Sequence, residues 1–313
     1  MCGIIACVGS NDAVDTVLTG LKNLEYRGYD SAGLAIQNGT DLVVRKRAGK
    51  ISDLTDGFVR ELPQGISGIG HTRWSTHGPP TDANAHPHTS ASGTVAVVHN
   101  GVISNYETLR SELEGLGYVF ESDTDTEVIP HLVEHFLDNG LDSDAAFREA
   151  IQRLEGSYAI ALMIEGEDTV RAARQGSPLV VGLHDDAYYL ASDVPAFLEF
   201  TDEVIYLEDG DVVTVDEGSL EITDLDGRPI SREIDTVDWD PEETGKGGYD
   251  HYMLKEIESQ PESLSNTIRG RIDPEAPAVH LEDFPSGCFE DVTEVHFVAC
   301  GTSYHAALYG ARL

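Results

Sequence analysis

Short apolar runs broken by turn residues cover positions 2–215, and this pattern predicts many strands and few helices. The first run, residues 2–8, has the length of a buried strand. Beyond Asp12, which suits a helix N-cap, apolar residues recur every three or four positions and predict an amphipathic helix. The other segments with the composition of strands are residues 34–37, 42–46, 66–72, 94–99, 158–164, 170–174, 179–183, 188–191, 204–207 and 212–215.

Three further helices are predicted between the two groups of strands. One begins at a capping box formed by Ser104 and Glu107 and ends at Glu114, and the others span residues 127–138 and 143–154. Strands, then helices, then strands again indicate two antiparallel sheets with helices packed on them. The expected fold class is therefore α+β, with a layered sandwich over residues 1–223 as the first domain.

A change of composition marks the end of this domain. Residues 224–250 are polar and rich in Gly and Pro, so we expect a linker there. Beyond it, a helix is predicted from residue 252 to about Pro261, and a strand over residues 295–299 leads through a Gly turn into a helix over residues 304–313. A strand, a turn and a helix form half of a βαβ unit. Residues 251–313 are thus expected to be an incomplete second domain.

The charge of the chain excludes several classes of function. The 56 Asp+Glu against 20 Lys+Arg give a net charge of −36, spread without a single acidic tract. Such a surface suits a protein kept soluble in high salt, and it would repel nucleic acid and anionic membranes. No apolar run reaches the 18 residues of a membrane span, and the four Cys have neither disulfide nor zinc spacing. We therefore expect a cytoplasmic chain with reduced thiols.

Cys2 is the first candidate for chemistry. Removal of Met1 would leave a cysteine with a free α-amine, whose pKa of about 7.7–8.0 lets it accept a proton near neutral pH. The residue would then carry a nucleophile and its general base together. The alternative is that Cys2 only begins a buried strand.

Two more candidates follow predicted strands. Arg73 offers a two-pronged donor for a carboxylate, with Thr76 and His77 beside it, although a surface ion pair would also explain an Arg at a strand end. Asn100 and Gly101, at the end of the strand over residues 94–99, could donate two hydrogen bonds to a developing negative oxygen. The alternative for the Asn-Gly pair is a plain turn.

Two further polar segments are candidates for a site, residues 122–127 and residues 84–88. The acids of residues 122–127 could cap the helix that follows or bind an ammonium group. In residues 84–88, a Pro separates two His and no Cys or Glu pair lies near, so we expect a loop and not a metal site. No metal and no organic cofactor is predicted.

Taken in order, five motifs resemble the class II glutamine amidotransferases. They are CGI (2–4), LEYRGYDSAG (24–33), HTRWSTHG (71–78), HNG (99–101) and SDTDTE (122–127). Two segments further on, residues 250–261 and 299–303, are similar to the entry of the sugar-isomerase domain that one branch of this family carries. The resemblance implies an αββα N-terminal-nucleophile amidase sandwich, followed by the start of an α/β sugar-isomerase domain.

The resemblance also implies roles for individual residues. Cys2 would attack the side-chain amide of glutamine, with Asn100 and Gly101 as the oxyanion hole. The residues implied to bind glutamine are Arg73, Thr76 and His77 at its carboxylate, Asp125 with the Trp74 and Gly101 backbones at its ammonium group, and Arg27 near the loop that covers it. Thr302 and Ser303, at a helix N-terminus, would begin a sugar-phosphate site.

In that branch of the family, ammonia from glutamine converts fructose 6-phosphate to glucosamine 6-phosphate, and the chains pair through the isomerase domain. Family chains are roughly twice as long, so this chain is expected to be an N-terminal piece capable at most of glutamine hydrolysis, and a homodimer when full length. Two alternatives stay open. One is another class II amidotransferase, of the amidophosphoribosyl or asparagine-forming type, and the other is a sugar-phosphate-binding regulatory protein with an inactive amidase fold.

Overall fold

The computed structural model describes residues 2–10, 12–58, 62–75, 77–185, 187–238, 247–269, 271, 287–288, 291–299 and 301–312, without the side chains of residues 56–58 and 301. The chain forms two compact units, Met1–Gly248 and Tyr249–Leu313. We call them the first unit and the second unit and describe each by itself.

Two antiparallel sheets form the centre of the first unit. The eight-stranded sheet has the order β14-β11-β9-β10-β1-β4-β2-β3, and the six-stranded sheet has the order β13-β12-β8-β7-β6-β5. The strands are β1 (Gly3–Val8), β2 (Ser31–Asn38), β3 (Asp41–Ala48), β4 (Ser67–Arg73), β5 (His88–Thr89), β6 (Val95–Ile103), β7 (Gly156–Ile164), β8 (Val170–Gln175), β9 (Val180–His184), β10 (Ala187–Ala191), β11 (Glu203–Tyr206), β12 (Val212–Asp216), β13 (Ser219–Thr223) and β14 (Asp235–Thr236).

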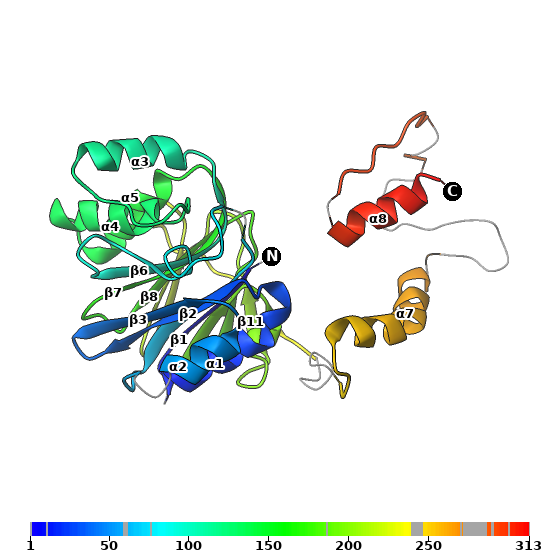
Figure 1. The fold of residues 1–313 in the computed structure, drawn as a ribbon, viewed down its shortest axis with the longest axis horizontal. Helices are drawn as coiled ribbons and strands as arrows, with labels where there is room; N and C mark the ends of the chain where they lie inside the picture. Colours follow the sequence, from blue (N-terminus) through cyan, green and yellow to red (C-terminus); the bar gives the residue numbers. More distant parts are fainter. Residues whose placement is uncertain are drawn as a thin grey trace. The chain divides into compact units, whose positions relative to one another are not determined.

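Helices cover the outer face of each sheet (Figure 1). On the eight-stranded sheet lie α1 (Ala13–Asn23) and α2 (Ile51–Phe58), and on the six-stranded sheet lie α3 (Tyr106–Gly115), α4 (Val128–Asp138) and α5 (Ser143–Gln152). The described residues of the unit also include the short 3-10 helices Glu25–Arg27 and Val194–Ala196. The layers are therefore helix, sheet, sheet and helix, as predicted.

Both faces of strand β1 are apolar because a buried core lies on each side of it. Ile5 and Cys7 point into the core under α1, while Ile4, Ala6 and Val8 point into the core between the two sheets. Successive side chains of a strand alternate between faces, so a strand with a buried layer on each side reads as a continuous apolar run. A third core separates the six-stranded sheet from its helices.

The first unit differs from the predictions in three places. The helix expected at Ser104 has Asn105 as its N-cap, without a side-chain capping bond, because the Ser104 N–H donates to Glu155 O at the end of the sheet. The helix α2 was not predicted at all. In the range expected to be a linker, β14 pairs with β11 and Val237 packs into the core under α1. The first unit therefore extends past residue 224.

The second unit contains two helices among its described residues, α7 (Tyr252–Ile268) and α8 (Gly301–Gly310). The predicted end of the first at Pro261 was wrong. Pro261 removes one N–H donor, but about two turns of helix on each side hold the element together. The strand predicted over residues 295–299 was also wrong. Val295, Phe297 and Val298 are exposed, and no strand among the unit's described residues pairs with them.

Across the described part of the chain, no helix combines the length and the apolar character that a membrane crossing requires.

Candidate active site

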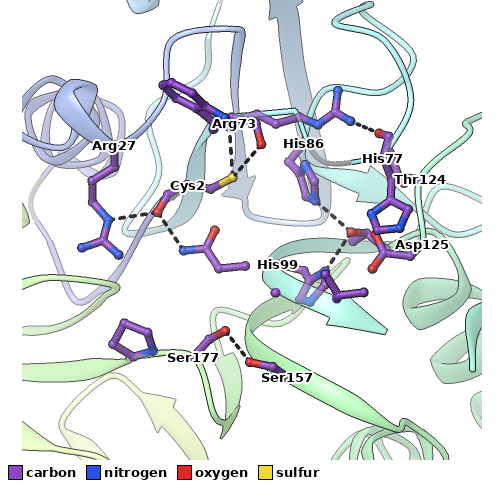
Figure 2. A pocket seen from close by; sticks show the side chains of 16 residues that line it. Cys2, Arg27, Arg73, His77, His86, His99, Thr124, Asp125, Ser157 and Ser177 are labelled. Atoms are coloured by element: carbon purple, nitrogen blue, oxygen red, sulfur yellow. Dashed lines mark hydrogen bonds between the residues drawn. The ribbon is translucent and has the colours of Figure 1, made fainter. Parts of the chain in front are cut away.

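One cavity of about 460 Å³ gathers most of the candidate residues (Figure 2). It lies where β1 begins, where β4 ends, and where β6 and β7 of the other sheet pass beneath them. The antiparallel pairing of Gly3 with Thr72 sets Cys2 beside the end of β4. The lining residues are Cys2, Arg27, Arg73, Trp74, His77, His86, His99, Asn100, Gly101, Val102, Thr124, Asp125, Thr126, Ser157, Ser177 and Pro178.

Cys2 is held at both its thiol and its carbonyl. The Trp74 N–H donates to Cys2 Sγ over 3.1 Å, and Cys2 O accepts from Arg27 Nε and from Asn100 Nδ2, each at 3.0 Å. Burial raises the pKa of the Cys2 thiol above its ordinary value, although the Trp74 N–H and the positive charges of Arg73 and Arg27 act in the opposite direction. The thiol therefore needs a base before it can act as a nucleophile near neutral pH.

Asn100 and Gly101 lie inside β6 and not at a strand end. The sheet continues through them because Gly101 pairs with Tyr158 and Val102 pairs with Ser157. Gly101 has φ +132°, and a Cβ there would lie 1.9 Å from Ser157 O, so only glycine fits. The strand thus brings a side-chain amide and a main-chain N–H to the same wall of the cavity as Cys2.

The residues predicted to hold glutamine line the cavity, except for Thr76, which lies outside the described residues. Arg73 is almost fully buried. Its Nη1 donates to Pro79 O at 3.3 Å and its Nη2 to Gly78 O at 3.3 Å and to His77 O. In this structure the guanidinium therefore holds the loop over residues 77–79.

Asp125 is the acid of residues 122–127 that reaches this cavity. It is buried, and its Oδ2 accepts a hydrogen bond of 2.8 Å from Ile103 N. The helix that follows begins at Val128 with Glu127 as its N-cap, so Asp125 does not cap it. The arrangement places a carboxylate on the wall of the cavity, where an ammonium group could meet it.

Arg27 lines the cavity and is bonded on both sides. Besides bonding Cys2 O, it donates from Nη1 to Asp193 Oδ2 at 2.7 Å, and Tyr26 OH donates to the same oxygen at 2.7 Å. The sequence placed Arg27 among the residues that bind glutamine, and that role stays a prediction. Its hydrogen bond to Cys2 O also makes it a support for the main chain of Cys2.

Two acids of the site were missed from the sequence. Asp30 Oδ2 accepts from Ser75 N at 2.7 Å, and the Asp30 N–H donates to Arg73 O, so this acid anchors the chain just after β4. Asp30 lies within the motif over residues 24–33, which could have suggested it. Nothing in the sequence pairs Asp193 with Arg27, because the two are 166 positions apart.

Four histidines form a buried layer beside the cavity. His71 stacks on His86 with ring centroids 4.1 Å apart, and His86 meets His88 edge-on at 4.6 Å. Thr126 Oγ1 lies within hydrogen-bond distance of both His86 Nε2 and His99 Nδ1. Desolvation lowers the pKa of all four imidazoles, that of His71 to about 3. The layer is therefore neutral near pH 7.

The residues predicted for a sugar phosphate lie in the second unit. Thr302 and Ser303 are exposed in the first turn of α8, which begins at Gly301. In the described residues of both units, no group of three or more His, Cys, Asp or Glu side chains is arranged to hold a metal ion.

Comparison with known proteins identifies the first unit. The family described as "Glutamine amidotransferase domain" matches residues 71–199. The chain is 49% identical to the isomerising glutamine–fructose-6-phosphate aminotransferase of Thermus thermophilus and 48% identical to that of Halobacterium salinarum, in each case over 100% of this chain and 51% of the relative. The chain thus spans about half the length of the curated relatives it matches.

Among solved structures, glutamine phosphoribosylpyrophosphate amidotransferase from B. subtilis superposes with a TM-score of 0.63 and 26% identity, over 71% of this chain and 49% of that one. The fold of the first unit is accordingly that of the N-terminal-nucleophile class II amidotransferases.

Proposed function

Because the chain belongs to the class II glutamine amidotransferases, we propose that its first unit hydrolyses the side-chain amide of glutamine with Cys2 as the nucleophile. The observation that carries the proposal is the position of Cys2 Sγ in one cavity with Asn100, Gly101, Arg73 and Asp125. A nucleophile, oxyanion donors, a cation and an anion together match the reacting amide and the zwitterionic end of glutamine.

The reaction begins once Met1 is removed. The α-amine of Cys2 takes the proton from Sγ, and the thiolate attacks the amide carbon of glutamine. Asn100 Nδ2 and the Gly101 N–H donate to the oxygen that becomes negative. The amine returns the proton to the leaving nitrogen, ammonia departs, and a thioester remains on Cys2. Water then attacks the thioester, which releases glutamate and restores the thiol.

Glutamine is oriented by its two charged ends. Arg73, with Thr76 and His77, takes the carboxylate, and Asp125, with the Trp74 and Gly101 backbones, takes the ammonium group. Since the guanidinium of Arg73 is bonded to the carbonyls of residues 77–79, it would act both on the carboxylate and on the loop over these residues. Arg27 keeps Cys2 O in place throughout.

For the complete enzyme we propose the conversion of fructose 6-phosphate to glucosamine 6-phosphate with ammonia from this site. The supporting observation is the similarity of the whole chain, second unit included, to relatives of that name. Thr302 and Ser303 would then be the first residues of the sugar-phosphate site, at a helix N-terminus. We further propose a cytoplasmic homodimer. The three described cysteines are free thiols, which suits a reducing compartment.

Glutamate release from glutamine by this chain, with Met1 removed, tests the glutaminase step. We expect Cys2→Ala to reduce the rate at least about 10³-fold, and Cys7→Ala, which alters a buried thiol outside the cavity, to retain it. A form that keeps extra residues before Cys2 should be as inactive as Cys2→Ala, because its amine lies in a peptide bond. Undiminished activity of Cys2→Ala would refute the assignment. Formation of glucosamine 6-phosphate by the complete gene product tests the second step.

A further inference from the structure

His71 is a buried residue next to the catalytic groups, and the proposed reaction leaves it without a role. It lies in β4, one strand away from Cys2, and its side chain crosses to β6 of the other sheet. Its Nε2 is 2.9 Å from Asn100 Oδ1 and 3.1 Å from His99 O. Only about 1% of the residue is exposed, so bulk water does not compete for these contacts.

The His99 carbonyl determines which nitrogen of His71 carries the proton. A main-chain oxygen can only accept a hydrogen bond, so Nε2 must donate to it. Nδ1 of His71 has no partner among the described residues, and a proton there would be a buried donor without an acceptor. The ring is therefore neutral, with its single proton on Nε2, in agreement with the strong lowering of its pKa by burial.

That proton in turn determines how the amide of Asn100 is turned. The Asn100 atom that faces Nε2–H has to be the acceptor, Oδ1, and so the NH2 group must face the other way. On that side Nδ2 donates to Cys2 O at 3.0 Å with one hydrogen. Its second hydrogen has no protein acceptor among the described residues and is available to the substrate.

We propose that His71 is a positioning residue that fixes the amide of Asn100 with its NH2 group toward the reacting oxygen of glutamine. The proposal rests on the proposed glutaminase function. His71 does not touch the substrate and transfers no proton. It prevents the Asn100 amide from turning over. In the turned amide, Oδ1 would face the negative oxygen of the substrate and repel it. Its stacking on His86 holds the ring in the plane that this requires.

The two amide substitutions of His71 form a matched test. In His71→Gln the side-chain nitrogen can reach the place of Nε2, whereas in His71→Asn the nitrogen is near the place of Nδ1 and falls short of Asn100. Loss of a whole oxyanion donor reduces kcat about 10²–10³-fold. We therefore expect His71→Asn to lower kcat about tenfold to a hundredfold and His71→Gln to stay within about threefold of the wild type. KM for glutamine should change less than about twofold in both, since the charged ends of glutamine are held elsewhere.

A double variant separates positioning from a general structural effect. In an Asn100→Ala background, His71→Asn should cause no further loss of kcat, because the group it positions is gone. The proposal would be overturned if the loss of kcat in the double variant equalled the product of the losses in the two single variants. A rise in KM in place of a fall in kcat in His71→Asn would also overturn it. So would equal losses in His71→Gln and His71→Asn. A wild-type chain without glutaminase activity would instead overturn the proposed function.

Nitrogen NMR of the wild-type chain tests the inference without relying on activity or on the folding of a variant. Labelled His71 should give a neutral ring with the proton on Nε2 throughout pH 5–9. A proton on Nδ1 anywhere in that range would contradict the orientation argument.

Discussion

The two units of the chain present their predicted sites in opposite ways. In the first unit, Cys2, Arg73, Asn100 and Asp125 come from segments far apart in the sequence and line one cavity. In the second unit, Thr302 and Ser303 are exposed on α8, and α7 has no buried residue. Motif residues therefore form a site only where other segments of the chain line a cavity around them. Among the described residues, the predicted glutamine-binding residues line one cavity, whereas Thr302 and Ser303 lie exposed on α8.

Apart from the loss of the Cys2 thiol itself, the largest change to the first unit should come from Gly101→Ala. The new Cβ would meet Ser157 O at 1.9 Å, and φ +132° is unfavourable for any other residue, so the N–H must move from its place. We expect kcat for glutamine hydrolysis to fall at least about 10²-fold and the free energy of unfolding to drop by about 1–3 kcal/mol. Gly115→Ala is the matched control, because a Cβ there meets open space. Near wild-type turnover by Gly101→Ala would contradict the role of the Gly101 N–H as an oxyanion donor.

Acidification should weaken the first unit through the four histidines of the buried layer, His71, His86, His88 and His99. The pKa of His71 is about 3 in the fold, against about 6.5 when unfolded. The unfolded chain thus takes up the proton first, and the stabilisation is complete above about pH 6.5 and declines as the pH falls toward 3. Each such imidazole steepens the decline by about 1.4 kcal/mol per pH unit. The other three shift in the same direction.

Urea unfolding between pH 6.5 and 5 in high salt measures this slope. The range stays above the titration of Glu127, whose folded pKa is lowered to about 2 and whose contribution is lost only below about pH 4.5. His88→Gln should reduce the slope by about one proton. A slope insensitive to His88→Gln would show that the layer does not titrate on unfolding.

The smallest effect is expected from the second unit. Because the described lining residues of the cavity around Cys2 belong to the first unit, Thr302→Val and Ser303→Ala should change glutamate release by the chain less than about twofold. A loss of tenfold would mean that the second unit takes part in glutamine hydrolysis and would abolish the contrast between the units.

The sequence predicted what depends on local pattern. The alternating and periodic apolar residues gave the sheets and most helices, and the motifs gave Cys2, Arg73, Asn100 and Asp125. Contacts between remote segments could not be read in this way. The bond of Arg27 to Asp193 and that of His71 to Asn100 exist only after the strands are in register.

The errors have related physical causes. A strand needs a hydrogen-bonded neighbour, and residues 295–299 have none among the described residues of their unit. Asn100 and Gly101 resemble a turn in sequence, but pairing with β7 keeps them in a strand. The helix α7 continues through Pro261 because residues on both sides favour it more than one missing bond opposes it.

The central claim is that Cys2 is a nucleophile aimed at the amide of a bound glutamine. Mass spectrometry of the chain after incubation with a glutamine analogue, in which a diazoketone replaces the side-chain amide, tests it most directly. The account predicts one adduct per chain, located on Cys2, and competition by glutamine. Labelling of the exposed Cys288 in its place, or no adduct once Met1 has been removed, would contradict it.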